Sequence, residues 1–351
     1  MVAGARSGVG VGVRRVLRGI GVLAGMCAVV TSLFPISAGA SDGSSCRDVR
    51  FEARLARALP VSVYGRYCRP AGATARTPLQ VLVPGATYNH SYWDYPRHRY
   101  SYTAHATESG FATLAIDRLG SGRSSRPPSV LLTAAGQAEV VHQVIQQAIA
   151  GRVPGVRHER VALVGHSLGS AIATVEAATY RDVDAVVLTG VTHGIDLGAT
   201  ADTFLRRMHP ALVDPAMRTL DPGYVTTRPG HRSGLFLSDA GGPGAAELDE
   251  RTRDVVSATE VPDAIAVLTA PVSRRISVPV LLAVGDRDKL FCGPMSAGRC
   301  ATAATLRAAE GPDYAELETF VLPGAGHSLN LMPRAARYMT AVQRWLHARL
   351  G

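Results

Sequence analysis

The chain has 351 residues, of which 46% are hydrophobic and 19% are charged, a composition that excludes a disordered protein, a collagen-like protein and a coiled coil. The formal net charge is +9, but Lys289 is the only lysine, and the arginines are scattered singly or in pairs. A nucleic-acid-binding surface would present a run or stripe of basic side chains, so the charge does not indicate a nucleic-acid partner.

The first 40 residues have the pattern of a secretory signal peptide. They contain four arginines and no acidic residue, then an apolar run over residues 19–34, then Ala38-Gly39-Ala40. A charged start, a short apolar run and a small-residue end predict cleavage after Ala40. The run of about 16 residues is shorter than the ~20 needed to span a bilayer, which disfavours an uncleaved anchor. Arg14-Arg15 resembles a twin-arginine signal, and the export route stays open. We therefore expect a secreted protein with no stable membrane span.

Cysteine usage agrees with export. Outside the signal segment there are four cysteines, and an even number in an exported chain indicates disulfides. Four cysteines allow three pairings, and proximity favours Cys46–Cys68 and Cys292–Cys300. The cysteines have no CxxC spacing and no accompanying histidine cluster, so they do not indicate a metal site.

After the signal segment, short apolar runs alternate with stretches of helical period. Continuous apolar strands separated by helices are typical of a parallel sheet that is buried on both faces. Residues 47–67 alternate like strands with no helix between them, which predicts an antiparallel hairpin at the edge of the sheet. The expected strands lie at 79–83, 111–116, 161–164, 185–188, 278–284 and 320–322, and the expected helices at 131–150, 170–180 and 333–350.

Residues 193–273 interrupt this alternation. The interval shows no clear strand, contains several prolines and carries scattered large apolar side chains. About eighty residues are too many for a loop in a compact domain, so we predict an inserted, mainly helical cap. The expected organisation is a signal peptide at 1–40, an α/β core at 41–192, the cap at 193–273, and the rest of the core at 274–351.

A strong catalytic motif follows the expected strand at 161–164. Gly165-His166-Ser167-Leu168-Gly169 stands between a strand and a helix, which is the context of a nucleophile elbow. The two glycines allow a turn so sharp that side chains would collide with the neighbouring backbone. Ser167 is the predicted nucleophile, and a serine needs a base that is oriented by an acid.

The base and the acid are expected after the later strands, in the order Ser, Asp, His. His327 stands in the Gly-rich loop after the strand at 320–322, and it is the predicted base. Asp288 is the predicted acid, because it lies where its side chain can curl back toward the histidine. Asp286 is the alternative, and Asp196 is a more distant one.

The oxyanion of an acyl-transfer reaction needs two further donors. We expect the backbone N–H groups of Leu168, directly after the nucleophile, and of Ala86, in the turn Pro84-Gly85-Ala86-Thr87. The aromatic side chains that follow either line a substrate pocket or pack at the upper edge of the sheet. They are Tyr88, Tyr92, Trp93 and Tyr95.

These motifs together resemble those of the α/β-hydrolases over essentially the whole mature chain. The segment 117–124, of the form D-x-x-G-x-G-x-S, resembles a structural loop of that family. One departure is Pro84-Gly85, where the family commonly has His-Gly; this change keeps the backbone donor. The resemblance implies an α/β-hydrolase fold, and its serine members include esterases, lipases, lactonases, thioesterases, peptidases and cofactor-free haloperoxidases.

The sequence therefore predicts a secreted serine hydrolase that cleaves carboxylic esters, with lactones as further candidates. This mechanism needs no metal and no organic cofactor. The apolar residues of the cap favour a small-molecule ester substrate with a hydrophobic part. A peptidase or a cofactor-free haloperoxidase on the same triad is the main alternative, and a non-catalytic ligand-binding homologue is a weaker one. The oligomeric state is left open.

Overall fold

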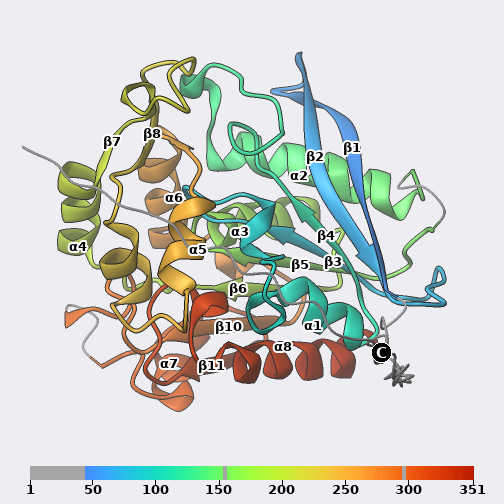
Figure 1. Cartoon of the computed structure of the whole chain (residues 1–351). Coiled ribbons are helices and arrows are strands. Elements are labelled where there is room, and N and C mark those ends of the chain that lie inside the picture. Colours follow the sequence, from blue (N-terminus) through green and yellow to red (C-terminus); the bar gives the residue numbers. More distant parts are fainter. Residues whose placement is uncertain (1–43, 153–155, 295–297) are drawn as a thin grey trace, which may run out of the picture. The chain divides into compact units, whose positions relative to one another are not determined.

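The computed structural model of the chain describes residues 44–152, 156–294 and 298–351. Eight strands form one sheet in the order β1-β2-β4-β3-β5-β6-β10-β11 (Figure 1). The pairs β1–β2 and β2–β4 are antiparallel and all the other pairs are parallel. The strands are β1 (Ser45–Leu55), β2 (Leu59–Arg69), β3 (Leu79–Val83), β4 (Ala112–Ile116), β5 (Val161–His166), β6 (Ala185–Thr189), β10 (Val280–Gly285) and β11 (Leu317–Leu322).

The inner parallel strands are buried along their whole length. Every residue of β3, β4, β5, β6 and β10 is buried, because helices cover both faces of the sheet. One hydrophobic cluster joins α2 and α3 to one face, and a second joins α1 and α8 to the other. The six predicted runs all contain or overlap observed strands, and the predicted mostly parallel sheet is confirmed. The helices around the sheet are α1 (Tyr102–Glu108), α2 (Ala134–Ile149), α3 (Leu168–Tyr180), α7 (Ala303–Glu310) and α8 (Ala335–Leu350).

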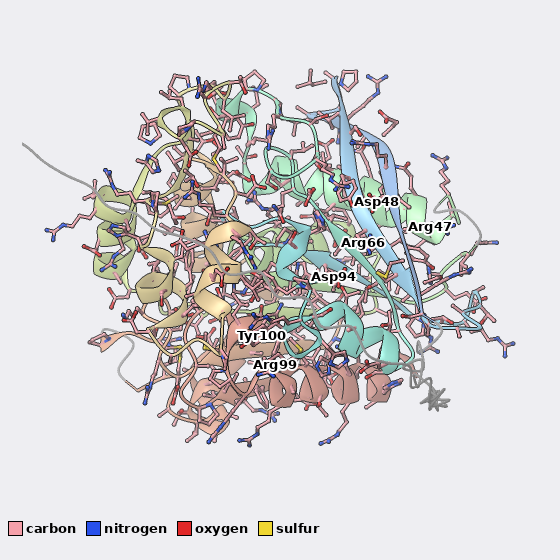
Figure 2. All side chains as sticks on the ribbon, in the orientation of Figure 1. Arg47, Asp48, Arg66, Asp94, Arg99 and Tyr100 are labelled. Atoms are coloured by element: carbon pink, nitrogen blue, oxygen red, sulfur yellow. A yellow bond between two sulfur atoms is a disulfide. The ribbon has the colours of Figure 1, made fainter. Side chains whose placement is uncertain are left out.

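The predicted edge hairpin is present as β1 and β2. Cys46 lies directly opposite Cys68 in the register, and the two form a disulfide across the strands. Arg66 on β2 pairs with Asp48 of β1 at 3.2 Å and with Asp94 of the segment after β3 at 3.0 Å (Figure 2). The disulfide and the Arg66–Asp48 ion pair therefore link the two strands of the hairpin, and the Arg66–Asp94 ion pair links the hairpin to the loop that follows β3.

Residues 193–273 contain more strand than the sequence analysis predicts. Helices are the main elements of the interval, but three short strands pair into a separate antiparallel sheet, β7-β8-β9. The prediction that this interval has no strand is wrong, because strands of two to four residues are too short to show an alternation of apolar and polar side chains. The elements are α4 (Leu197–Asp202), β7 (Met208–Pro210), β8 (Tyr224–Thr227), α5 (Ala245–Arg251), β9 (Val256–Ser257) and α6 (Glu260–Thr269).

The predicted signal peptide, residues 1–40, lies outside the described residues. Among the helices of the described ranges, none has both the length and the apolar character required to cross a bilayer.

Candidate active site

Ser167 stands at a strained turn between β5 and α3. Its backbone has φ 53° and ψ −120°, a conformation that a residue with a side chain adopts at a cost. A Cβ at Gly165 would lie 2.5 Å from the carbonyl oxygen of Gly169, and one at Gly169 would lie 2.1 Å from that of Val83. Only glycine fits at both positions, so the spacing of the motif follows from the crowding of this turn. The turn leaves Ser167 partly exposed at the end of a buried strand.

Asp288 and His327 meet at the ends of β10 and β11. His327 Nδ1 lies 2.8 Å from Asp288 Oδ2, and both side chains are buried, with exposed fractions of 1% and 0%. The other carboxylate oxygen, Oδ1, accepts the backbone N–H groups of Leu290 at 2.9 Å and Phe291 at 3.3 Å. These two hydrogen bonds fix the orientation of the carboxylate, so that Oδ2 faces the imidazole.

The other two aspartates considered as the acid are occupied elsewhere. Asp286 Oδ1 accepts the backbone N–H of Gly324 at 2.7 Å, which ties the loop after β10 to the loop that carries His327. Asp196 Oδ1 accepts the N–H of Ala199 and caps α4. Of the three carboxylates, the structure brings only that of Asp288 to His327 among the described contacts.

His166, the residue before Ser167, is a feature that the sequence analysis assigned no role. Its ring stacks on Tyr92 at 4.3 Å and lies 4.9 Å from the ring of His327. Burial, followed by the nearby His327, lowers the pKa of His166 well below its usual value. The ring therefore stays neutral beside His327 and does not oppose a positive charge there.

The turn after β3 approaches Ser167 closely. A Cβ at Gly85 would lie 3.0 Å from the Cβ of Ser167, so a side chain at this position would crowd the serine. Tyr88 N–H closes the turn by donating to the carbonyl of Gly85 at 3.3 Å, and Thr87 has a positive φ of 59°. Leu168 is the first residue of α3, and the hydrogen bonds of a helix leave its first N–H groups unused.

Two buried arginines hold this turn from different directions. Arg118 Nε donates to the carbonyl of Pro84 at 3.1 Å and Nη2 to that of Gly85 at 3.2 Å, while Nη1 pairs with Glu260 at 2.7 Å. Like His166, the two arginines, Arg118 and Arg232, are site residues that sequence reasoning missed. Arg118 stands in the D-x-x-G-x-G-x-S segment, and this motif was the feature of the sequence that could have pointed to it.

Arg232 acts on the same turn from within residues 193–273. Its Nη1 donates to Thr87 Oγ1 at 2.9 Å, and its Nη2 pairs with Asp249 at 2.9 Å. The guanidinium also lies 4.8 Å from the ring centroid of Phe236 and 4.4 Å from that of Tyr88. No local motif surrounds Arg232, so its role is visible only in the folded chain.

A small apolar cavity opens at Ser167. Its volume is about 80 Å³, and among the described residues that line it the polar side chains are Ser167 and three threonines. Core residues form one side, and residues of the interval 193–273 form the rest. Lining residues include Ala86, Thr87, Leu168, Phe204, Met208, Phe236, Val261, Ala264, Leu268 and Phe291.

The aromatic side chains after β3 do not line this cavity. Tyr88, Tyr92, Trp93 and Tyr95 are each at most 1% exposed and belong to the hydrophobic cluster on the α1–α8 face of the sheet. None of them is among the residues that line the cavity. Of the two roles considered from the sequence, the structure therefore supports packing.

Comparison with known proteins identifies the family of the chain. The model of the "Alpha/beta hydrolase family" matches residues 80–337, which is most of the chain. The chain belongs to the alpha/beta hydrolase family. No sequence among the curated proteins matches the hydrolase.

Solved structures show the same fold at low sequence identity. E-2-(acetamidomethylene)succinate hydrolase is 20% identical, with a TM-score of 0.55 over 86% of this chain and 100% of that one. A thermophilic esterase from Thermogutta terrifontis is 17% identical, with a TM-score of 0.54 over 86% and 100%. A monoacylglycerol lipase from Paleococcus ferrophilus is 17% identical, with a TM-score of 0.52 over 87% and 99%.

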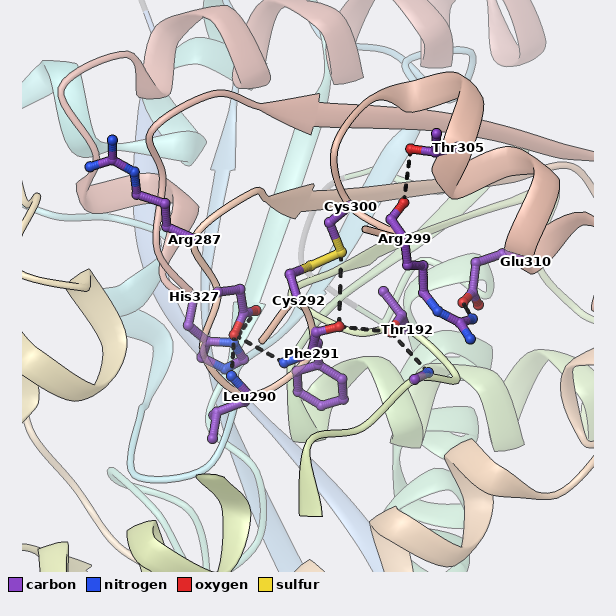
Figure 3. The surroundings of a disulfide bond; sticks show 12 residues. Thr192, Arg287, Leu290, Phe291, Cys292, Arg299, Cys300, Thr305, Glu310 and His327 are labelled. Carbon is purple, nitrogen blue, oxygen red and sulfur yellow. Dashed lines mark hydrogen bonds and ion pairs between the residues drawn. A yellow bond between two sulfur atoms is a disulfide. The ribbon is translucent and has the colours of Figure 1, made fainter. Parts of the chain in front are cut away.

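The second disulfide of the hydrolase lies near His327 (Figure 3), and the backbone N–H of Cys292 donates to the carbonyl of Asp288 at 2.8 Å. Cys292 and Cys300 close a loop directly after Phe291, whose carbonyl accepts a hydrogen bond from Thr192 Oγ1 at 3.2 Å. The ring of Phe291 stacks on His327 with centroids 5.8 Å apart. Both predicted disulfides are confirmed, and this one braces the backbone that holds the carboxylate of Asp288.

Proposed function

We propose that this alpha/beta hydrolase is a secreted serine hydrolase that cleaves carboxylic esters through an acyl-enzyme. Ser167 is the nucleophile, His327 the general base and Asp288 the acid that orients it. The observation that carries the proposal is the buried Asp288–His327 pair at 2.8 Å, whose imidazole lies 4.9 Å from the ring of His166, the residue before Ser167. A buried carboxylate that binds one nitrogen of an imidazole leaves the other nitrogen to exchange a proton with a serine.

In the proposed reaction, Ser167 Oγ forms a bond to the ester carbonyl carbon while its proton passes to His327 Nε2. Asp288 stabilises the imidazolium through Nδ1–H, and His166 stays neutral beside it. The backbone N–H groups of Ala86 and Leu168 stabilise the tetrahedral oxyanion. His327 then gives the proton to the departing alkoxide, which leaves an acyl group on Ser167. Water attacks this ester by the same steps in reverse and releases the acid.

The cavity supports a substrate with a hydrophobic part of modest size. No lysine, arginine or carboxylate is among the residues described as lining it, so it offers no partner to a charged substrate. Residues 193–273 supply most of the apolar wall, which supports their assignment as a cap over the site. Secretion is supported by the two disulfides, because such bonds persist in oxidising compartments.

A fluorophosphonate probe tests the nucleophile without requiring the natural substrate. We expect it to modify the mature chain at Ser167, as located by peptide mass spectrometry, and to leave Ser167→Ala unmodified. Hydrolysis of p-nitrophenyl esters from acetyl to dodecanoyl should likewise be lost in Ser167→Ala. Rates with matched amides and lactones, and rates of peroxide-dependent halogenation, are then compared with the rate of ester hydrolysis to test the other reactions open to such a triad. Absence of labelling, or hydrolysis that survives in Ser167→Ala, would overturn the proposal.

A further inference from the structure

A second cluster of chemically active side chains lies away from Ser167, at the opposite end of α3. It consists of His142 on α2, Glu176 on α3 and Asp182 just after α3. His142 Nδ1 lies 2.7 Å from Asp182 Oδ2 and 3.9 Å from Glu176 Oε1. One ligand atom from each of the three residues falls within 4.8 Å of the others. Nothing in the proposed ester hydrolysis uses these groups.

The cluster joins two carboxylates to a single histidine. The side chain of Glu176 is 0% exposed, and neither of its carboxylate oxygens has a hydrogen-bond partner in the described part of the chain. Within the same ranges, His142 is the only ion-pair partner of Glu176 and of Asp182. Both carboxylates also stand at the C-terminal end of α3, where the helix dipole favours a cation.

We propose that His142, Glu176 and Asp182 bind one divalent transition-metal ion, for which Zn²⁺ is the best match. One imidazole and two carboxylates are ligands that Zn²⁺ accepts, and its two charges balance those of the carboxylates. Tetrahedral Zn²⁺ with bonds of 2.0–2.1 Å places its ligand atoms about 3.3 Å apart. The two separations from His142, 2.7 and 3.9 Å, lie on either side of that value, and no two of the ligand atoms are more than 4.8 Å apart, so shifts of up to about 1.5 Å complete the site.

Neighbouring side chains already orient two of the ligands. Gln146 Nε2 donates to Asp182 Oδ2 at 2.6 Å, and the ring of Tyr180 stacks on His142 at a centroid distance of 3.9 Å. Contacts of this kind fix the direction of metal ligands and raise metal affinity. Because His142 comes from α2 and the carboxylates from the end of α3, the metal joins the two helices. It therefore binds the folded chain and stabilises it.

Metal titration of the mature chain, without a histidine tag and stripped with EDTA, tests the site. Isothermal titration with Zn²⁺ should give one site per chain, and Co²⁺ at the same site should add visible d–d absorption. At a hundredfold excess over Kd, Zn²⁺ should raise the Tm by on the order of 5 °C. Both effects should be lost in His142→Ala and in Glu176→Gln.

Two controls separate this site from weaker surface binding. His98 and Glu108 form an exposed histidine–carboxylate pair on the surface, so His98→Gln should retain full Zn²⁺ binding. Ser167→Ala should also retain it, because the site is independent of the proposed hydrolysis. A proton shared between Glu176 and Asp182 is the competing explanation of the buried pair. Absence of Zn²⁺ binding, or binding that persists unchanged in both ligand variants, would overturn the proposal in favour of that proton.

Discussion

Replacing Arg232 by methionine should destabilise the folded chain by about 3–5 kcal/mol, the usual effect of leaving a buried charge without its partner. Arg232 and Asp249 are both 0% exposed and pair at 2.9 Å, so the substitution leaves the carboxylate of Asp249 buried without its cation. Replacing both partners by apolar side chains of similar volume is commonly neutral or stabilising. The double variant Arg232→Met/Asp249→Leu should therefore recover most of the lost stability.

Activity should respond differently from stability. The double variant still lacks the donor to Thr87 Oγ1, so the turn that carries the proposed oxyanion donor Ala86 loses one of its two braces. Misplacement of such a group by about 1 Å costs on the order of 100-fold in rate, so we expect a 10- to 100-fold lower kcat. KM should change little, because the oxyanion forms only in the transition state.

Urea unfolding and p-nitrophenyl ester kinetics on the wild type and the two variants measure both effects. Stability close to that of the wild type in Arg232→Met would refute the buried ion pair. A stable double variant with wild-type kcat would refute the positioning of the turn by Arg232.

Three other changes follow from the site. Asp288→Asn should lower kcat by about 10⁴, as loss of a triad acid does. Asp286→Asn should leave kcat within a few-fold and lower the Tm, because the Asp286 carboxylate ties two loops together. A larger loss of kcat in Asp286→Asn than in Asp288→Asn would make Asp286 the acid. Ala264 on α6 lines the cavity, so the larger side chain of Ala264→Leu should lower kcat/KM for octanoyl esters more than for acetyl esters. An unchanged dependence of kcat/KM on acyl-chain length would place the acyl group outside this cavity. Burial lowers the pKa of His166 below its ordinary value of about 6.5. At a pH below about 6.5 the unfolded chain therefore binds a proton at His166 that the folded chain does not. The free energy of unfolding should then fall by up to about 1.4 kcal/mol for each pH unit of acidification. Urea unfolding between pH 7.5 and 5 should show a flatter slope in His166→Asn, and an identical slope would assign the acid sensitivity to other groups.

The parts of the fold that the sequence predicted are those with a strong local signal. Strand β3 was predicted with its observed bounds, because a run that is apolar except for Gln80 ends at a Pro-Gly pair. The strands β7, β8 and β9 were missed, because two to four residues are too few to carry a period. Helices α1 and α7 were also not predicted, and each has at most eight residues.

By itself, the sequence determined that the chain is an alpha/beta hydrolase with a serine at a strand–turn–helix junction, and it selected the two disulfide pairings. These features depend on residues that are close along the chain. The tertiary structure decided which aspartate meets His327, since Asp288 and Asp286 differ only in the direction in which the folded loop points them. It also paired Arg118 with Glu260 across 142 positions, and it placed the buried carboxylate of Glu176 3.9 Å from His142 Nδ1. The burial and pairing of such charges depend on contacts between distant segments, which no local pattern records.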